Sequence, residues 1–527
     1  MTIADPTVSS VPRSDPAGIN AVLGELDKPC YVVRTGEGTA VCNEPVVDDA
    51  DIVAAVGPLP SERLGSPRFR ADHGVRHAYL GGAMAGGIAR EEFVIALARA
   101  GFLGSFGAAG LLPDRIERAL RRFATEIPGL PYAVNVIHSP SEEALERRTV
   151  ELLLHYGVRR VEASAFMDLT EHIVRYRLAG LSADRQGRPL VGNRVIAKVS
   201  RTEVAERFMR PPPAELVRRL LSEGLITRQQ ADLAAGVPMA DDITVEADSG
   251  GHTDRRPLTA LFPAVVGTRE RVAAEFPPAA HLRIGAAGGI GTPWAAAAAF
   301  ALGADYVVTG SVNQSCVEAG TSEAAKELLA KAGVADCEMA PAADMFELGV
   351  ELQVLRKGTL FPMRAKRLFE LYRSHSGIEE LSAEDRDRLE KQILRKPVSE
   401  VWDEVTEYFE RRDPEQLHRA ARDPKRRMAL VFRWYLGMAS RWASVGEDTR
   451  TPDYQIWCGP AMGAFNDWVA GTYLAEPANR RVSDVAGHVM RGAALVSRAN
   501  QLRLAGVHLP TTCSDYRPLR PVREERE

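Results

Sequence analysis

The stretch that decides the fold is Ile284-Gly-Ala-Ala-Gly-Gly-Ile-Gly-Thr-Pro293, followed by Leu302-Gly-Ala-Asp-Tyr-Val-Val-Thr-Gly-Ser311. The pattern predicts a strand, a glycine loop, an alanine-rich helix, a second strand and a Gly-Ser turn. Two successive turns of small residues direct several backbone N–H groups toward one phosphate, as the last two strands of a (β/α)8 barrel do. The glycine spacing is not Gly-x-Gly-x-x-Gly, which disfavours a Rossmann site. A purely structural glycine turn is the remaining alternative.

The alternation of strands and helices begins near residue 75. Amphipathic helical segments separate most of eight short apolar segments, which we predict to be strands: His77–Leu80, Gly101–Phe106, Tyr132–Val136, Val158–Ala163, Val195–Val199, Ile243–Ala247, Leu282–Ala286 and Tyr306–Thr309. Eight strands that alternate with helices favour a closed parallel sheet over an open one. The predicted fold class is therefore α/β, a (β/α)8 TIM barrel.

The rest of the chain divides around this barrel. Residues 1–27 are expected to form a mobile N-terminal tail, because the first twenty are rich in Pro, Ser and Asp. Residues 28–74 are expected to form a small segment with a hairpin, and residues 75–350 the barrel. Residues 351–527 are expected to form a helical C-terminal domain, with helices over Pro362–Ser374, Ala383–Leu394, Val398–Arg411, Pro424–Ala443 and Arg481–Leu504.

A helical insert is predicted over about residues 203–240, after a mid-barrel strand. It contains Pro211-Pro-Pro213 and two helical patterns, Ala214–Glu223 and Thr227–Ala235, the second with Thr227 as N-cap. The insert is too long for an ordinary connection between elements of a barrel. Two placements stay open: a lid or substrate platform over the barrel mouth, or a peripheral addition.

Composition excludes several classes of function. The 527 residues are 45% hydrophobic and 26% charged, which is usual for a globular protein of more than one structural unit. A net charge of −4 gives no electrostatic case for binding nucleic acid or an anionic membrane. The six cysteines contain no Cys-x-x-Cys pair, which indicates reduced thiols in a cytoplasmic enzyme and no metal site. The sequence shows neither a secretion signal nor an apolar run long enough to span a bilayer.

Candidate site residues follow the strands, since chemistry in a barrel is located at the carboxyl ends of its strands. The run Gly81-Gly-Ala-Met-Ala-Gly-Gly87 would let a large flat ligand approach the backbone, or would simply be a flexible loop. Asn135 is either a hydrogen-bonding residue for a ring edge or a turn residue. Lys198 either places a positive charge in the barrel mouth or extends to solvent.

The segment Thr244-Val-Glu-Ala-Asp-Ser-Gly-Gly-His-Thr253 carries the candidate acid–base group. Gly250 and Gly251 open the backbone and present His252 at the rim, where an imidazole is able to act as general acid, general base or hydrogen-bond donor near neutral pH. The candidates to orient His252 are three nearby carboxylates: Glu246, Asp248 and Asp254.

These segments resemble a known family. Ala78-Tyr-Leu-Gly-Gly-Ala-Met-Ala-Gly-Gly-Ile88, Asn135-Val-Ile-His138 and Ala287-Gly-Gly-Ile-Gly291 are similar to the flavin barrels of the nitronate monooxygenase and FabK-type enoyl reductase superfamily. Pro238-Met-Ala-Asp-Asp-Ile-Thr-Val-Glu-Ala-Asp-Ser-Gly-Gly-His-Thr-Asp254, with the insert and the helical C-terminus, resembles the PfaD-like proteins, which are trans-acting enoyl reductases of polyunsaturated fatty acid and polyketide synthases. The resemblance covers roughly residues 28–527. It departs after Asp254, where the family pattern reads Asn-Arg-Pro and this chain has Arg255-Arg256-Pro257.

The resemblance implies noncovalent FMN, NADPH as reductant and a 2-enoyl thioester on an acyl carrier protein as substrate. It implies His252 and Lys198 as catalytic residues. The implied cofactor-binding residues are Gly82, Ala83, Met84 and Ala85 against the ring, Asn135, Lys198, Gly250 and Gly251 around it, and Gly288, Gly289, Gly310 and Ser311 at the phosphate. Basic residues suited to an acidic carrier are Arg207, Arg210, Arg218, Arg219, Arg364, Lys366 and Arg367.

Two further functions compete with the reductase. One is a nitronate monooxygenase-like flavin oxidase, in which the His acts as a base. The other is a non-catalytic protein that binds flavin or docks on a synthase. A homodimer through the C-terminal helices is also considered, because Trp434, Tyr435, Trp442 and Trp468 need burial; packing on their own chain is the alternative.

Overall fold

The computed structural model describes residues 11–36, 38–44, 52–138 and 143–522. Eight parallel strands close into a barrel in the order β4 Tyr79–Gly81, β5 Leu103–Phe106, β6 Ala133–Ile137, β7 Arg160–Ser164, β10 Arg194–Val199, β11 Asp242–Glu246, β13 Arg283–Ala287 and β14 Val307–Thr309. Each of the eight predicted strands is a strand of this barrel, so the predicted (β/α)8 fold is confirmed.

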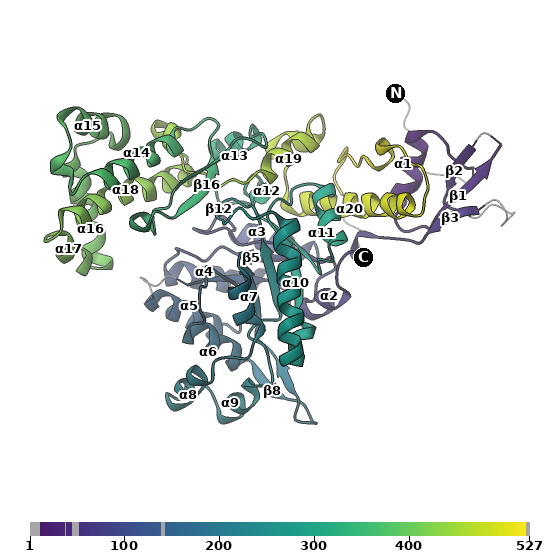
Figure 1. Ribbon diagram of the computed structural model, residues 1–527, viewed down its shortest axis with the longest axis horizontal. Helices are drawn as coiled ribbons and strands as arrows, with labels where there is room; N and C mark the ends of the chain where they lie inside the picture. The colour runs from purple at the N-terminus through teal and green to yellow at the C-terminus, as the bar shows by residue number, and fades with distance from the viewer. Residues whose placement is uncertain (1–10, 37, 45–51, 139–142, 523–527) are drawn as a thin grey trace.

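Helices cover the outside of the barrel (Figure 1). They are α3 Glu91–Arg99, α4 Pro113–Glu126, α5 Glu143–His155, α6 Glu171–Ala179, α7 Thr202–Met209, α10 Leu258–Glu275, α11 Pro293–Ala301 and the short α12 Ser311–Gln314. Helix α4 shows why these segments are helical. Ile116, Ala119, Leu120 and Phe123 recur at helical spacing and are buried, whereas the residues between them are mostly charged.

The barrel interior is filled in layers. At the closed end, the carboxylate of Asp242 accepts from Arg283 and bonds His73 Nε2 at 2.9 Å. Next to this ion cluster, apolar side chains from different strands meet in one buried group that includes Leu80, Leu103, Ile196, Ala287 and Val308. These layers close the barrel, so a ligand has access only from the carboxyl ends of the strands.

The helical insert lies on the outer side of the barrel, although its residues Leu216 and Arg219 line a cavity with His138, Thr170 and Glu171, which follow β6 and β7. Its helices α8 Ala214–Ser222 and α9 Arg228–Ala234 pack against α6, and α9 also contacts β8 Leu181–Ala183, which pairs with β9 Pro189–Val191. Figure 1 shows α8, α9 and β8 at the end of the molecule opposite β12 and β16. Of the two placements left open by the sequence, the structure favours the peripheral addition over the lid.

The N-terminal region corrects one expectation. Residues 16–24, expected to belong to a mobile tail, form helix α1 Pro16–Gly24, which starts at the N-cap Asp15 and buries Ile19, Val22 and Leu23. The physical reason is the packing of this short apolar face on α20 Val482–Leu504. Residues 1–10 lie outside the described residues. The expected hairpin is present as β1 Cys30–Thr35 and β2 Gly38–Cys42, and β3 Ile52–Val56 extends its sheet.

The boundary expected at residue 350 falls inside a small sheet. Strands β15 Cys337–Pro341 and β16 Glu351–Leu355 form an antiparallel pair, and β16 also pairs with β12 Gly251–His252 from the barrel loop. Residues on both sides of the expected boundary are therefore held by one hydrogen-bonded ladder. The sheet lies at the barrel mouth because β12 directly follows β11.

The C-terminal helices form two groups. One group extends from the barrel and contains α14 Phe361–Ser374, α15 Ala383–Arg388, α16 Val398–Arg412, α17 Glu415–Ala420 and α18 Pro424–Val445 (Figure 1, green, left). The second group returns to the barrel: α13 Glu323–Ala330 and α19 Ala461–Val469 lie near it, and α20 packs against α11 and α3. Tyr435, Trp442 and Trp468 are buried within the chain and Trp434 is half-buried, so these aromatic residues pack on their own chain, the alternative to a dimer interface.

No helix in the described ranges is long and apolar enough to cross a membrane.

Candidate functional site

The floor of the barrel mouth is a largely buried group of charged and polar side chains from four neighbouring strands. Lys198 Nζ on β10 lies 3.6 Å from Glu162 Oε1 on β7 and 3.5 Å from Glu246 Oε1 on β11. Asn135 on β6 donates through Nδ2 to the main-chain oxygen of Glu162 at 2.9 Å and to Ser164 Oγ at 3.0 Å. Two of the predicted residues, Asn135 and Lys198, are thus joined by a residue that was not among the candidates from the sequence, Glu162.

Lys198 keeps its positive charge in this environment. Burial lowers the pKa of the ammonium, but the carboxylates of Glu246 and Glu162 more than offset that effect, and the pKa is raised above its usual value. A lysine held in the charged form does not abstract protons near neutral pH. The chemistry open to Lys198 is therefore electrostatic: it stabilises an anionic ligand at the floor of the mouth.

The glycine loop after β4 folds tightly over this floor. Gly82 leaves no room for a side chain, because a Cβ there would lie 2.9 Å from Val308 Cγ1. The next residue, Ala83, donates its N–H to Glu162 Oε2 at 2.9 Å. Gly107 is equally restricted, since its Cβ would lie 1.8 Å from the oxygen of Met84. The loop that contains Gly82, Ala83, Met84 and Ala85 is therefore held against the polar floor.

The two glycine turns that follow β13 and β14 lie side by side, because these strands pair directly. Gly288 and Gly289 have φ of +82° and +72°, values that favour glycine, and the space beside Gly289 and Gly310 is open. Within the described residues, the N–H groups of Gly289, Gly310 and Ser311 donate to no protein acceptor. Ser311 Oγ accepts from the N–H of Gly459 at 3.1 Å. Unpaired N–H groups beside open space suit an anionic group such as a phosphate.

His252 lies at the rim on β12, with its side chain about half exposed (46%). Its Nε2 bonds Asp344 Oδ1 at 3.2 Å. Burial lowers the pKa of His252, but the hydrogen bond and charge of Asp344 outweigh it, so the pKa is raised above its usual value. Since Asp344 holds Nε2, Nδ1 is the ring atom left for a ligand.

None of the three carboxylates expected to orient His252 bonds its ring, although the charge of Glu246 contributes to raising its pKa. Glu246 Oε1 accepts from Ser249, Asp248 accepts from Gln353 Nε2, and Asp254 accepts from Ser200 and Arg201. The carboxylate at His252 belongs to Asp344, 92 residues along the chain. The pairing of β12 with β16 brings the segments together, and no local pattern in the sequence signals it.

Gly250 and Gly251 shape the loop that presents His252. A Cβ at Gly250 would lie 2.8 Å from the nitrogen of Cys458, so this loop packs directly on the residues before α19. Gly251 has φ of +81°. Gln353 on β16 donates to the main-chain oxygen of Ser249 at 2.7 Å. The rim is therefore built jointly by the barrel and the C-terminal region.

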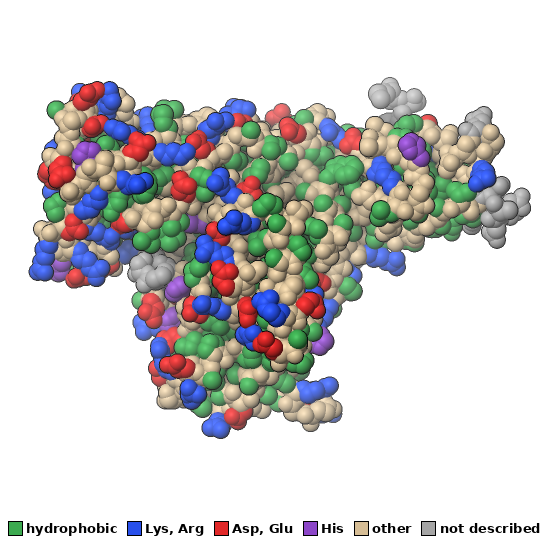
Figure 2. Space-filling model, viewed as in Figure 1, with side chains coloured by type: hydrophobic (Ala, Val, Ile, Leu, Met, Phe, Trp, Pro, Cys, Tyr) green, Lys and Arg blue, Asp and Glu red, His purple; other side chains and the backbone are tan. Residues whose placement is uncertain are grey.

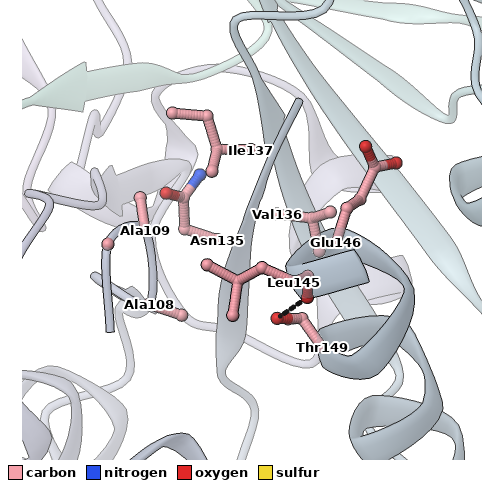
Figure 3. Close-up of a pocket in the computed structure, with 9 residues that line it drawn as sticks. Ala108, Ala109, Asn135, Val136, Ile137, Leu145, Glu146 and Thr149 are labelled. Carbon is pink, nitrogen blue, oxygen red and sulfur yellow. Dashed lines mark hydrogen bonds between the residues drawn. The ribbon is translucent and has the colours of Figure 1, made fainter. Parts of the chain in front are cut away.

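A small cavity borders the outer side of Asn135 (Figure 3). It is lined by the loop after β5, the end of β6 and the first turns of α5: Ala108, Ala109, Gly110, Asn135, Val136, Ile137, Leu145, Glu146 and Thr149. Thr149 donates its hydroxyl to the oxygen of Leu145, so its polar atom is satisfied locally. The lining is largely apolar and suits a small uncharged group next to the mouth.

One signal in the sequence pointed to Glu162. An acidic residue within the apolar run Val158–Ala163 is unusual for a buried strand, because a buried carboxylate needs partners. Asp344 offered no such signal, since a single exposed aspartate in a loop is common.

Comparisons with known proteins agree with this architecture. The nitronate monooxygenase family matches residues 73–367, more than half of the chain. The N-terminal domain of the fatty acid synthase protein PfaD matches residues 8–56. The inserted helical domain of [acyl-carrier-protein] S-malonyltransferase matches residues 375–454.

Individual relatives are similar over most of the chain. One component of the polyunsaturated fatty acid synthase of Thraustochytrium sp. is 46% identical over 91% of this chain and 32% of its own length. The polyketide biosynthesis protein PksE of Bacillus subtilis is 43% identical over 83% of this chain and 57% of its own. This chain therefore spans less than two thirds of these curated relatives. The crystal structure of the enoyl reductase domain of MlnA, from the macrolactin cluster of Bacillus amyloliquefaciens, is 39% identical with a TM-score of 0.81, and the match covers 84% of this chain and all of that domain.

Proposed function

Because this chain belongs to the nitronate monooxygenase family, in its PfaD-like branch, we propose that it is a trans-acting, FMN-dependent enoyl reductase. Its substrates would be 2-enoyl thioesters on acyl carrier proteins in polyketide or polyunsaturated fatty acid synthesis, and NADPH its reductant. The observation that carries the proposal is the match to the whole MlnA enoyl reductase domain, in a chain whose barrel mouth combines two open glycine turns with a largely buried lysine.

The mouth fits FMN in charge and shape. The unpaired N–H groups of Gly289, Gly310 and Ser311, with Gly288, would hold the phosphate. The loop Gly82–Ala85 would lie against the ring, with Asn135, Lys198, Gly250 and Gly251 around it. When bound, the flavin supplies hydride transfer. The chain's own contribution is to orient the substrate and to place charge where the reaction needs it.

His252 would supply the proton. Asp344 holds Nε2 and raises the pKa of the ring, so Nδ1 is the atom that donates to the thioester oxygen or to the α-carbon. Lys198 remains charged and would stabilise negative charge at the floor of the mouth. The two groups come from neighbouring parts of the barrel, because Lys198 lies on β10 and His252 follows β11, which pairs with it.

An acidic carrier would meet this chain near the rim. The basic residues expected to bind it are mostly neutralised: Arg207, Arg210, Arg219, Arg364, Lys366 and Arg367 pair with carboxylates, and only Arg218 forms no ion pair with a described residue. Figure 2 shows basic and acidic side chains interspersed on the visible face. Arg255 and Arg256, next to His252, are exposed and form no ion pair within the described ranges. They are better placed to meet a phosphate of the carrier's prosthetic arm or of NADPH.

The six cysteines are free, and we propose a cytoplasmic location, where thiols stay reduced.

The experiment is a product analysis with the purified full chain. The bound cofactor is released and identified, and the protein is incubated with deuterated NADPH and a crotonyl-pantetheine thioester. Deuterium at the β-carbon of a butyryl thioester supports the proposal. Oxygen-dependent oxidation of a nitronate without thioester reduction would move the chain to the oxidase class, and absence of flavin would favour a non-catalytic role in a synthase.

A further inference from the structure

The two oxygens of the Glu162 carboxylate face two different groups. Oε2 accepts from Ala83 N–H in the glycine loop at 2.9 Å, and Oε1 lies 3.6 Å from Lys198 Nζ. The residue is fully buried, and Oε1 makes no hydrogen bond within the described residues. Through one hydrogen bond and one ion pair, this buried carboxylate links two parts of the mouth that come from opposite sides of the barrel.

We infer that Glu162 is a positioning residue that locks the loop Gly82–Ala85 to Lys198 and so preorganises the mouth for its ligand. Its functional meaning rests on the proposed flavin site. The loop is closely packed at this contact: a Cβ at Gly82 would lie 2.9 Å from Val308 Cγ1 and 3.9 Å from Glu162 Oε1. The same residue also accepts the side-chain amide of Asn135 on its main-chain oxygen, which ties a third element to the lock.

The chemistry of the two donors explains why a carboxylate is required. A glutamine has one acceptor oxygen and one NH₂ group, so it satisfies either Ala83 N–H or the Lys198 ammonium and turns a donor toward the other. Glu246 is not equivalent to Glu162. It also lies beside Lys198, at 3.5 Å, but its side chain accepts a hydrogen bond from Ser249 in the rim, not from the glycine loop.

The test compares amide hydrogen exchange of the peptide covering Gly81–Gly87 in the full chain, with and without FMN. Glu162→Gln should speed exchange at this loop by about tenfold or more, because a charge-assisted hydrogen bond is lost. It should also weaken FMN binding, measured by fluorescence titration, by about tenfold. The control Glu246→Gln removes a carboxylate from the same lysine and should leave the loop's exchange unchanged.

A second variant separates positioning from loss of folding. In Glu162→Gln/Lys198→Met the amide oxygen has no competing ammonium, so it is free to accept from Ala83 N–H. The rate of amide exchange in the loop should return toward the wild-type value, although the Lys198 ammonium is absent. A variant that fails to fold is recognised by faster exchange in β13 and α11, which serve as the internal reference.

Three results would overturn the inference: unchanged loop exchange in Glu162→Gln, an equal effect in Glu246→Gln, or no recovery in the double variant. If the wild-type chain binds no FMN, the proposed function fails, but the exchange data without flavin still decide whether Glu162 locks the loop to Lys198.

Discussion

His252 is the residue whose replacement separates chemistry from binding. Its ring lies at the rim, contacts Asp344, and is not one of the groups expected to hold the phosphate. His252→Ala should therefore retain flavin and lose enoyl reduction by about 10²–10⁴-fold, the usual contribution of a general acid. The check is kcat with a short enoyl thioester alongside the flavin absorbance of the purified variant. Wild-type turnover in this variant would remove His252 from the mechanism.

The pH profile should report the pair of His252 and Asp344. The pKa of His252 is raised, so the acid form persists below that pKa and is lost as pH rises through it. Thioester reduction should accordingly fall on the alkaline side. Asp344→Asn removes the charge that raises the pKa of His252, so its alkaline limb should move to lower pH. Identical profiles for wild type and Asp344→Asn would contradict the assigned role.

Replacing Arg255 tests whether the backbone at the rim is strained. Its φ of +49° lies in the left-handed region, which arginine adopts at a cost and asparagine tolerates. Arg255→Asn should raise the free energy of unfolding by about 0.5–1 kcal/mol, measured by urea denaturation. The control is Arg256→Asn, which does not lie at positive φ and should change stability little. A destabilised Arg255→Asn would show that the arginine side chain makes a compensating contact.

At the level of whole elements, the helical insert is a segment that can be deleted without separating the strands that flank it. Met239 donates its N–H to the oxygen of Arg210 at 3.0 Å, so the two ends of the segment 211–238 are adjacent. Replacing this segment with a short Gly-Ser linker should keep flavin binding and turnover per bound flavin within about threefold, because α8 and α9 pack on α6 outside the barrel and contribute none of the proposed site residues.

The same deletion should lower the melting temperature, since Leu220 and Ile226 are buried in the wild-type chain. Differential scanning fluorimetry measures this change. If the deletion variant folds and binds flavin but no longer reduces the thioester, the insert contributes to the active site and the prediction is wrong.

Across the whole molecule, the repeated strands and helices of the barrel could be predicted from the sequence. Contacts between segments far apart in the sequence could not. The eight barrel strands are short apolar runs separated by helical patterns, so each could be found locally, as in Val195–Val199. Asn135, Lys198 and His252 could be predicted as site residues because they lie at, or shortly after, the carboxyl ends of such strands. Helix α1 was missed because its apolar face is only three residues wide.

Contacts between segments far apart in the sequence could not be predicted without the three-dimensional fold. His252 pairs with Leu352 in the β12–β16 ladder, and this pairing brings Asp344 to its ring. The two strands are far apart in the sequence, so no local sequence pattern predicts the contact. The lock at Glu162 depends on the closure of the barrel, which brings β7 to the loop after β4. The closure of the barrel decides which polar side chains meet inside it. The sequence therefore predicts which residues belong to such a network, but not which hydrogen bonds they form.

The proposed function depends above all on the passage of electrons from reduced flavin to an enoyl thioester. Anaerobic stopped-flow absorbance follows this step itself: the protein is reduced with one equivalent of NADPH and then mixed with a crotonyl-pantetheine thioester. We expect rapid return of the oxidised flavin spectrum with formation of one equivalent of butyryl thioester. A flavin that stays reduced with the thioester, but is reoxidised quickly by oxygen after reduction by a nitronate, would refute the reductase and indicate an oxidase.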